Sequence, residues 1–277
     1  MTSTLPVRDL FDLEKKVVIV TGGLGQLGQQ FTGALLEGGA RVAVFDQGVN
    51  DECQPKELCA RASSDRLLLV AADVTNRDSL ESALAQVLAS WGSVFGLVNA
   101  AALDSPPDAP AEENGPFENY PEQSWDRVVE VNLKGVFLSC QVIGGQMARA
   151  GKGSIINIGS TYGVVSPDQR IYEYRRSSGA PFYKPVAYSA SKSGLLNLTR
   201  YLATYWAQQN VRVNMLTLGG VFNHQDQNFL RGYCQRVPMG RMARADEYNG
   251  AIIFLLSAAA SYMTGSNLVI DGGWTAW

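Results

Sequence analysis

Short apolar runs alternate along the chain with longer segments in which apolar residues recur every three or four positions. Runs rich in Val, Ile and Leu are typical of strands buried on both faces of a sheet. They occupy positions 16–20, 41–45, 67–70, 94–98, 154–158, 211–216 and 268–270. The helical pattern leads up to Gly38 and Gly39 and returns at 79–91, 124–150, 188–210 and 246–257. This uninterrupted alternation predicts an α/β domain with a doubly wound parallel sheet.

Several chemically distinctive residues fall at or just after the predicted strand ends. They are Gly22, Asp46, Asp73, Asn99, Ser160 and Gly219. The carboxyl ends of parallel strands meet at one edge of a sheet, and ligands of such sheets bind there. The sequence therefore predicts one ligand site at this edge, assembled from residues that lie far apart along the chain.

The other segments are predicted to be connections within a single domain at 15–277. Residues 1–14 are expected to lie on the domain surface as a leader, and 47–65 are polar with some helical character. Prolines and acids at 104–124 are typical of a loop. Residues 219–240 are expected to form a loop with short helical pieces, and we find no internal repeat.

Composition narrows the classes of function. The net charge of −3 includes no block of like charges, so nothing favours nucleic acid or a membrane surface as a partner. The amino-terminal residues lack the apolar stretch of a secretory signal, and no apolar run approaches a bilayer span. One histidine and four cysteines without metal-ligand spacing argue against a metal site. We expect a cytoplasmic protein with reduced thiols at Cys53, Cys59, Cys140 and Cys234.

The sequence TGGLGQLG at 21–28 joins the first predicted strand to the first predicted helix. In this context glycines let the backbone approach a pyrophosphate, and the helix N-terminus supplies N–H donors. A tight turn without a ligand is the alternative. Asp46 ends the second strand, where a carboxylate can accept both ribose hydroxyls of adenosine and repel a 2′-phosphate. No basic residue follows, so NAD is favoured over NADP; the alternative is that Asp46 only begins the next loop.

The segment YSASK at 188–192 places a phenol and an ammonium on one face of a predicted helix. The Lys192 ammonium is expected to lower the pKa of the Tyr188 phenol from about 10. That would suit proton exchange with an alcohol. A surface helix turn with an incidental tyrosine and lysine is the alternative. Asn132 lies within a predicted helix, where an amide is unfavourable unless it is used; exposure to water or contact with a carbonyl is the alternative.

Together these motifs resemble the short-chain dehydrogenase/reductase family over about residues 14–273. The motifs are TGGLGQLG, AADV at 71–74, VNAAA, VNLKGVF, GSIINIGS, YSASK, VRVNMLTLGGV and TGSNLVIDGG. The resemblance implies a single Rossmann-type domain and hydride transfer between a nicotinamide and a carbinol carbon of a small-molecule substrate. It also implies pairing into homodimers or homotetramers through the helix at 186–205. A weaker resemblance is to members from bacterial surface-sugar pathways.

The resemblance also implies roles for individual residues. Tyr188 would be the acid/base and Ser160 would hydrogen-bond the substrate oxygen. Lys192 would hold the nicotinamide ribose and lower the pKa of Tyr188, and Asn132 would support a water-linked proton path. The implied cofactor-binding positions are Gly22, Gly25, Gln26, Leu27, Gly28, Asp46, Asp73, Val74, Asn99, Ala100, Tyr188, Lys192, Gly219 and Val221.

The chain departs from the family pattern at several positions. Gln26 stands where single-domain members usually carry Gly, which fits the spacing of the nucleotide-sugar branch. The long C-terminal substrate region of that branch is missing, so we retain the single-domain assignment. Leu218 replaces a usual Pro, and Asn223 replaces a usual Thr near the nicotinamide carboxamide. Ala100 and Ala102 replace a usual Asn and Gly, although backbone binding could survive this change.

The interval between Ser160 and Tyr188 is longer than in most relatives, and 162–185 is predicted to be an inserted loop beside the substrate. Its cations are Arg170, Arg175, Arg176 and Lys184. Guanidinium groups suit phosphate or carboxylate, so we expect an anionic or nucleotide-activated sugar substrate. Solvated arginines at a subunit contact are the alternative. His224 titrates near neutrality, yet we expect a loop or substrate-pocket residue rather than a catalytic one.

The leading interpretation is an NAD-dependent oxidoreductase that interconverts a secondary alcohol and a ketone on a sugar or activated sugar. One alternative is a reductase of a 3-oxoacyl thioester or small hydroxy-ketone. The other is a non-catalytic NAD-binding regulator, against which the presence of Asn132, Ser160, Tyr188 and Lys192 argues. Polar groups around Ser160 and His224 would favour a sugar, and an apolar cleft would favour an acyl substrate.

Overall fold

A parallel sheet forms the centre of the molecule. The computed structural model describes residues 6–50, 58, 65–104, 112–179 and 182–277. Within them, seven strands pair in the order β3-β2-β1-β4-β5-β6-β7, all parallel. The strands are β1 (Val17–Thr21), β2 (Arg41–Asp46), β3 (Leu67–Ala71), β4 (Gly96–Asn99), β5 (Gly153–Ser160), β6 (Val211–Leu218) and β7 (Asn267–Ile270). The predicted doubly wound parallel sheet is confirmed.

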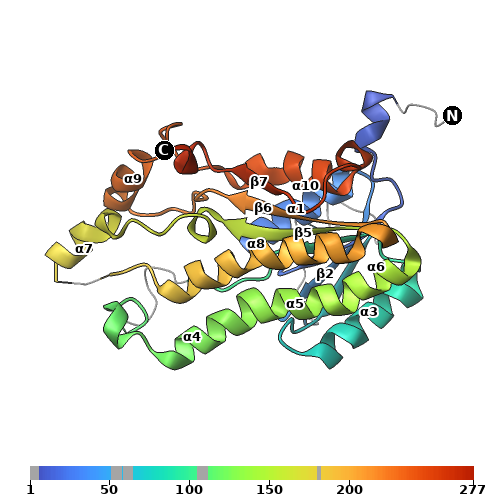
Figure 1. The fold of residues 1–277 in the computed structure, drawn as a ribbon, viewed down its shortest axis with the longest axis horizontal. Coiled ribbons are helices and arrows are strands. Elements are labelled where there is room, and N and C mark those ends of the chain that lie inside the picture. The colour runs from blue at the N-terminus through green and yellow to red at the C-terminus, as the bar shows by residue number, and fades with distance from the viewer. Residues whose placement is uncertain (1–5, 51–57, 59–64, 105–111, 180–181) are drawn as a thin grey trace.

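Helices cover both faces of the sheet (Figure 1). On one face, α1 (Gln26–Glu37) and α10 (Asn249–Leu256) bury leucine, isoleucine and phenylalanine side chains against the strands. On the other face, α3 (Arg77–Trp91), α8 (Val186–Trp206) and a long helix pack around a second apolar cluster. Because both faces are covered, the strands are apolar at nearly every position, which is why the sequence shows runs rather than alternation.

The long helix runs from Glu122 to Ala150 without a break. It consists of α4 (Glu122–Val129), α5 (Gly135–Ser139) and α6 (Gly145–Ala150), joined by two π-helical turns. These turns lie at Glu130–Lys134 and Cys140–Gly144. In length and composition the helix could cross a bilayer, contrary to the expectation that no run approaches that span. However, 56% of its apolar window is buried inside the protein, so it is a core helix.

Several element boundaries differ from the prediction. β5 and β6 each extend to eight residues because they pair with each other along their whole length. Ser160 is therefore the last residue of β5 instead of following it. The segment predicted as an inserted loop contains a 3₁₀ turn (Gln169–Tyr172) and α7 (Glu173–Ser177). The segment after β6 contains α9 (Gln227–Cys234). Asp226 is the N-cap of this helix, and its carboxylate accepts hydrogen bonds from the backbone N–H groups of Asn228 and Phe229.

The amino-terminal segment is only partly on the surface. Val7–Phe11 forms a 3₁₀ turn in which Val7 and Phe11 are exposed. Leu13 is completely buried in the cluster that contains α1 and α10. The structure thus anchors the predicted leader at Leu13. Most of the predicted helical character at 47–65 lies outside the described residues.

The glycine turn between β1 and α1 requires residues without a Cβ atom at two positions, Gly22 and Gly28. Gly22 has a φ of +66°, and a Cβ there would lie 2.6 Å from the Cα of Ala101 at the end of β4. A Cβ on Gly28 would lie 2.1 Å from the carbonyl oxygen of Gly22. Glycine is required at these positions because the backbone segments approach each other too closely for any larger residue.

We predict that Gly28→Ala destabilises the protein by about 1–3 kcal/mol, because the added methyl group must displace backbone. Gly250→Ala is the matched control: it lies in α10, and its Cβ would meet nothing within 4 Å. The control should be neutral or stabilising, by up to about 1 kcal/mol, because alanine favours helix. Urea unfolding of both variants measures the difference. Equal stabilities would show that α1 can move away from the glycine turn.

Candidate active site

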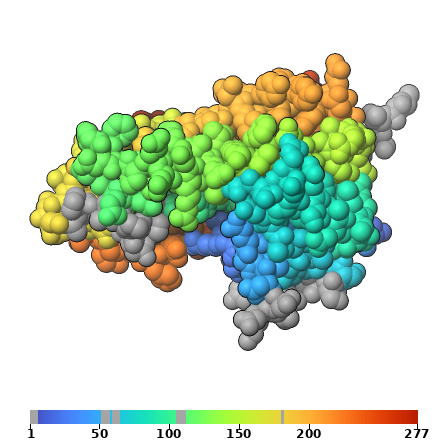
Figure 2. Space-filling view, turned by 90° about the horizontal axis from the view of Figure 1, so that it is seen from below, coloured from blue at the N-terminus to red at the C-terminus, as the bar shows by residue number. Residues whose placement is uncertain are grey.

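A groove runs along the carboxyl edge of the sheet. One cavity of about 270 Å³ is lined by Asp46 and Val74, together with the glycine turn. The adjoining cavity, of about 430 Å³, is lined by Ser160, Tyr188 and Lys192. Gly22, Gly25, Ala100 and Ala102 line both cavities, so the two form one groove. Figure 2 shows a hollow between the blue segment of the amino-terminal half and the orange segment that follows β6.

The structure brings Ser160, Tyr188 and Lys192 together at one end of this groove. Ser160 ends β5, and the other two lie one turn apart in α8. Lys192 is 3% exposed, and its Nζ donates a 2.8 Å hydrogen bond to the carbonyl of Ile158. The Nζ atom lies 6.0 Å from the centre of the Tyr188 ring. The predicted proximity of phenol, hydroxyl and ammonium is therefore present.

The predicted effect of Lys192 on the pKa of Tyr188 differs from what the structure shows. Burial raises the pKa of Tyr188, and the carboxylate of Asp104 raises it further, while the hydroxyl of Ser160 acts in the opposite direction. Burial lowers the pKa of Lys192 to about 8, although Asp104 opposes this shift. Loss of hydration is thus the largest influence on both pKa values, and Lys192 is not among the groups that shift the pKa of Tyr188. The sequence pattern could not reveal the depth of burial.

Asn132 is completely buried in the first π-helical turn of the long helix. Its Oδ1 accepts from the backbone N–H of Leu103 at 2.7 Å, and its Nδ2 donates to the Leu103 carbonyl at 2.9 Å. Nδ2 also lies 3.3 Å from the Oγ of Ser191. The amide thus fixes the segment that leaves β4 for the groove. Its predicted part in a proton path stays a prediction.

Asp46 holds the glycine turn as well as lining the groove. Its Oδ2 accepts from the backbone N–H of Leu24 at 3.1 Å, and its Oδ1 accepts from that of Gly48 at 2.9 Å. In the turn after β3, Asp73 accepts from both the N–H and the hydroxyl of Thr75. Burial alone would raise the pKa of Asp73, but hydrogen bonds from Thr75 and Gln47 lower it overall. Asp46 lines the groove, whereas Asp73 lies between two residues that line it and does not line either cavity itself.

The start of α1 is open to the groove. Gly25 precedes the helix and no side chain caps it, so the first backbone N–H groups lack side-chain partners. These N–H groups belong to Gln26, Leu27 and Gly28. The side chain of Gln26 reaches across the groove and donates to the carbonyl of Phe222 at 3.1 Å. This contact is specific to glutamine and would be lost with the glycine that is usual at this position.

Asn99 lies beneath the groove rather than in it. Its side chain is 2% exposed and donates to the Oδ1 of Asn157 at 2.8 Å. Asn157 in turn donates to the hydroxyl of Thr199 on α8 at 2.9 Å. This buried chain of polar groups joins β4, β5 and α8. The backbone N–H of Ala100 donates to the Oγ1 of Thr21 at 3.2 Å, which ties the ends of β1 and β4 together.

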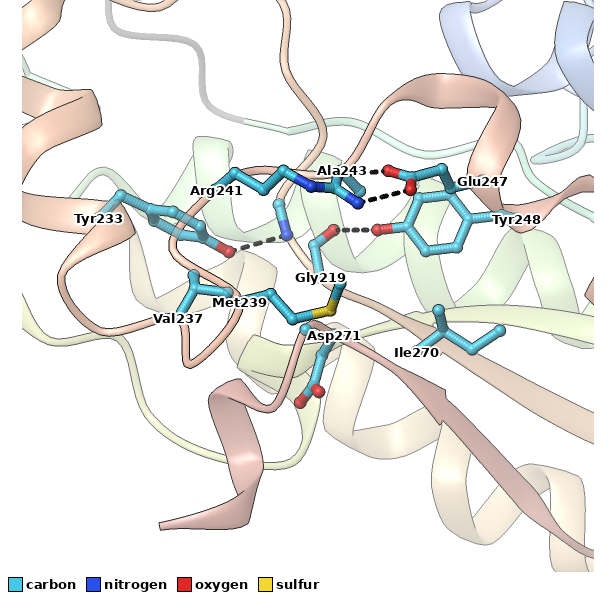
Figure 3. Close-up of a pocket in the computed structure, with 12 residues that line it drawn as sticks. Gly219, Tyr233, Val237, Met239, Arg241, Ala243, Glu247, Tyr248, Ile270 and Asp271 are labelled. Atoms are coloured by element: carbon cyan, nitrogen blue, oxygen red, sulfur yellow. Dashed lines mark hydrogen bonds and ion pairs between the residues drawn. The ribbon is translucent and has the colours of Figure 1, made fainter.

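Two tyrosines clamp the turn that follows β6 (Figure 3). The hydroxyl of Tyr233 accepts from the N–H of Gly220 at 2.7 Å, and that of Tyr248 donates to the carbonyl of Gly219 at 3.1 Å. A separate cavity of about 180 Å³ lies behind this turn. Gly219 and Val221 line the main groove as predicted positions for the cofactor. Tyr233, which the sequence analysis did not identify, connects α9 to this turn.

The predicted substrate cations do not line the groove. Arg170 pairs with Asp168 on the surface, and Arg176 donates to the carbonyls of Gln169 and Phe182 and to Glu173. Arg175 lies 5.3 Å from the centre of the Phe182 ring. His224 is exposed and packs edge-on against Phe222.

Lys184 does line the groove, as does Asp104. The sequence analysis named Lys184 among the loop cations but did not assign it to the site. It did not identify Asp104 as a site residue. No sequence signal connects the two, because they are 80 positions apart and meet only in the folded chain.

A metal site is not supported by the described residues. No group of three His, Cys, Asp or Glu in that part of the chain could hold a metal ion. Cys140 is buried, which raises the pKa of its thiol to about 12. Cys53 and Cys59 lie outside the described residues.

Comparison with known proteins relates the whole chain to oxidoreductases. Residues 25–275 match the family described as Enoyl-(Acyl carrier protein) reductase. An NAD-dependent glycerol dehydrogenase of Listeria innocua serovar 6a is 30% identical over 270 residues, covering 96% of each chain. A D-threitol dehydrogenase of Mycolicibacterium smegmatis is 35% identical over 272 residues, covering 96% of this chain and 95% of the relative. The crystal structure of a short-chain dehydrogenase from Leptospira borgpetersenii with bound NAD⁺ has a TM-score of 0.83 at 31% identity, covering 99% of both chains.

The burial of Lys192 predicts a pH-dependent stability. Between pH 8 and 10.5 the unfolded lysine binds a proton that the folded one has released, so stability rises with pH over this range. The stability of the protein relative to Lys192→Met should therefore increase by up to about 3 kcal/mol across this window. Denaturant unfolding at several pH values measures it, with Lys152→Met as the control for the substitution itself. A constant difference between the protein and Lys192→Met would contradict the burial of a titrating ammonium.

Proposed function

The chain belongs to the short-chain dehydrogenase/reductase family, and we propose that it is an NAD-dependent oxidoreductase that interconverts a secondary alcohol and a ketone on a sugar or polyol. One observation carries this proposal. The groove that begins at Asp46 ends at Ser160, Tyr188 and Lys192, so a dinucleotide along it would place its reactive ring beside a proton donor. The family assignment alone establishes an NAD(P)-dependent enzyme.

The residues along the groove fit a dinucleotide. Gly22 and Gly28 let the glycine turn pack closely against β4 and α1, and the uncapped start of α1 offers N–H donors to a pyrophosphate. Asp46 can accept the ribose hydroxyls, because each of its oxygens has a second lone pair beyond the bonds to Leu24 and Gly48. The bound nicotinamide would supply the hydride chemistry. Asp46 and the uncharged residues 47–50 that follow it support NAD over NADP.

Within the site, Tyr188 exchanges a proton with the substrate oxygen. Its raised pKa keeps the phenol protonated at neutral pH, which suits a proton donor in the reduction of a ketone. Ser160 is positioned to hydrogen-bond the same oxygen. Lys192 lies against the carbonyl of Ile158, so its remaining donors can hold a ribose hydroxyl. Asn132 acts through Leu103, by fixing the wall of the groove.

The substrate class rests on the polar groups of the groove. Asp104 and Lys184 lie beside Tyr188, and Asn223 and Gln225 also line the cavity. Apolar side chains such as Phe229 and Met242 line it too, so it is the charged pair beside Tyr188 that favours hydroxyl groups over the acyl chain of the alternative thioester reductase. The relatives described above are named for glycerol and D-threitol, and this agrees with a polyol. The complete set of proton-transfer residues argues against a non-catalytic regulator.

Assembly and location complete the proposal. Tyr201 and Tyr205 stack on the outer face of α8 with ring centres 5.9 Å apart, and both are more than half exposed. Phe137 is also exposed on the long helix that packs beside α8. We propose that this face pairs two copies of the chain into a homodimer or homotetramer. The cytoplasmic location stays a prediction from the sequence.

We predict that Tyr188→Phe retains NADH binding and loses roughly 10²–10⁴-fold in turnover, because only the proton donor is removed. Tyr201→Phe on the same helix is the control, and its turnover should equal that of the unchanged protein. Fluorescence titration with NADH and initial rates on a polyol measure the two properties. Full turnover by Tyr188→Phe would place the proton donor elsewhere.

We predict that Asp46→Asn lowers the preference for NADH over NADPH by about 10- to 100-fold, as expected for loss of a charged hydrogen-bond partner. The substitution keeps an acceptor oxygen for the glycine turn but removes the charge that would repel a 2′-phosphate. The readout is the ratio of kcat/KM values for the two nucleotides. Asp73→Asn, in the turn after β3, should leave that ratio unchanged. If Asp46→Asn also left it unchanged, another residue would select the nucleotide.

A further inference from the structure

An ion pair lies on the substrate side of Tyr188. The Nζ of Lys184 is paired with the carboxylate of Asp104 and lies 4.8 Å from the centre of the Tyr188 ring. Both residues line the same cavity as Ser160 and Tyr188. The Lys184 side chain is 8% exposed, whereas that of Asp104 is 59% exposed. The lysine is thus a nearly buried cation, and the aspartate provides its more accessible counter-charge.

The backbone beside each member of the pair is fixed by a side-chain amide. Gln169 donates to the carbonyl of Lys184 at 3.1 Å and accepts from its N–H at 2.9 Å. Asn132 binds both backbone groups of Leu103, the residue before Asp104. A two-point contact of this kind fixes position and orientation together. Charged groups held in this way are pre-organised, so a ligand need not pay for ordering them.

We propose that Asp104 and Lys184 form a subsite that recognises a second hydroxyl group on an uncharged polyol or sugar, next to the carbinol that reacts at Tyr188. This inference rests on the proposed function and specifies its substrate. A hydroxyl can donate to the Asp104 carboxylate and accept from the Lys184 ammonium at the same time. Hydrogen bonds to charged groups are the strong ones. A substrate without that hydroxyl would leave both charges without this partner.

The pair also explains why an anionic substrate would be disfavoured. Asp104 neutralises Lys184, so a substrate carboxylate or phosphate would meet a carboxylate beside the cation. The loop arginines do not compensate, because Arg170 and Arg176 make ion pairs with Asp168 and Glu173 away from the groove. We therefore expect a neutral substrate instead of the anionic or nucleotide-activated sugar that the sequence led us to expect.

Asp104 also affects the proton donor. The charged and titratable groups around Tyr188 are Asp104, Lys184, Lys192 and Tyr233, and the hydroxyl of Ser160 is its hydrogen-bond partner. Among them, Asp104 and Tyr233 raise the pKa of Tyr188 in addition to burial. Asp104→Asn removes one of these contributions, so the pH profile of alcohol oxidation should move to lower pH. A residue with a purely structural role would not shift that profile.

The experiment compares substrates that differ by a single group. With NAD⁺, kcat/KM is measured for butan-2-ol, butane-2,3-diol, threitol and threonate. In the unchanged protein we expect a higher kcat/KM for the diol than for butan-2-ol, and a higher kcat/KM for threitol than for threonate. Lys184→Met should lower kcat/KM for the diol and for threitol by about 10- to 100-fold more than it lowers kcat/KM for butan-2-ol. Asp104→Asn should lower kcat/KM for threitol and should raise the ratio of kcat/KM for threonate to that for threitol. The shift of the pH profile should appear with every substrate.

Two controls separate specificity from folding. Lys134→Met removes the cation of an exposed ion pair with Glu130 in the long helix and should change no ratio. Asp104→Asn is the second test if Lys184→Met fails to fold, because Asp104 is the more exposed partner. NADH titration of each variant verifies that the groove is intact.

The outcomes distinguish this inference from the proposed function. If the unchanged protein oxidises the polyols but both variants keep its ratio of diol to butan-2-ol, the subsite is wrong and the proposed function stands. If kcat/KM of a variant falls by the same factor for butan-2-ol and for the diol, the pair only positions Tyr188, and the proposed subsite is again wrong. If the unchanged protein oxidises none of the alcohols and NADH reduces none of the matching ketones, the proposed function fails, and the subsite with it.

Discussion

The junction between β1 and β4 is the constraint on which the rest of the structure depends. β1 pairs with β2 on one side and with β4 on the other, and all three run parallel. The connections that leave β1 and β4 therefore diverge to opposite faces of the sheet, and a groove opens between them. The two connections meet closely at its floor: a Cβ on Gly22 would lie 2.6 Å from the Cα of Ala101, so only glycine permits this approach of the backbones.

Buried amides transmit the geometry of the sheet to the groove. Asn99, Asn157 and Thr199 form a hydrogen-bonded chain from β4 through β5 to α8, the helix that carries Tyr188. Asn132, on the long helix that packs beside α8, binds the segment after β4. Buried polar groups are costly unless they are fully bonded, and when bonded they select one arrangement. The core thus fixes residues of the groove that apolar packing alone would leave free to shift.

Sequence periodicity was sufficient for the sheet and for most of the groove. Gly22, Asp46 and Ser160 could be placed because parallel strands end at one edge, whatever the details of packing. The same reasoning misplaced the side chain of Asn99, since a strand residue can point below the edge as well as into it. The long helix was predicted as one element, but its two π-helical turns were not, because the periodicity of the sequence continues through them.

Charges could not be placed from sequence in the same way. Arg176 looked like a substrate contact, yet its guanidinium binds the carbonyls of Gln169 and Phe182. Lys184 and Asp104 meet across 80 positions, and the carboxylate of Asp104 raises the pKa of Tyr188 in addition to burial. The most direct measurement is a crystal structure with NADH and a polyol. It should show the nicotinamide beside Tyr188, and the carbinol oxygen within hydrogen-bond distance of Tyr188 and Ser160. A dinucleotide bound outside the groove, or a Tyr188 side chain turned away from the nicotinamide, would contradict this account.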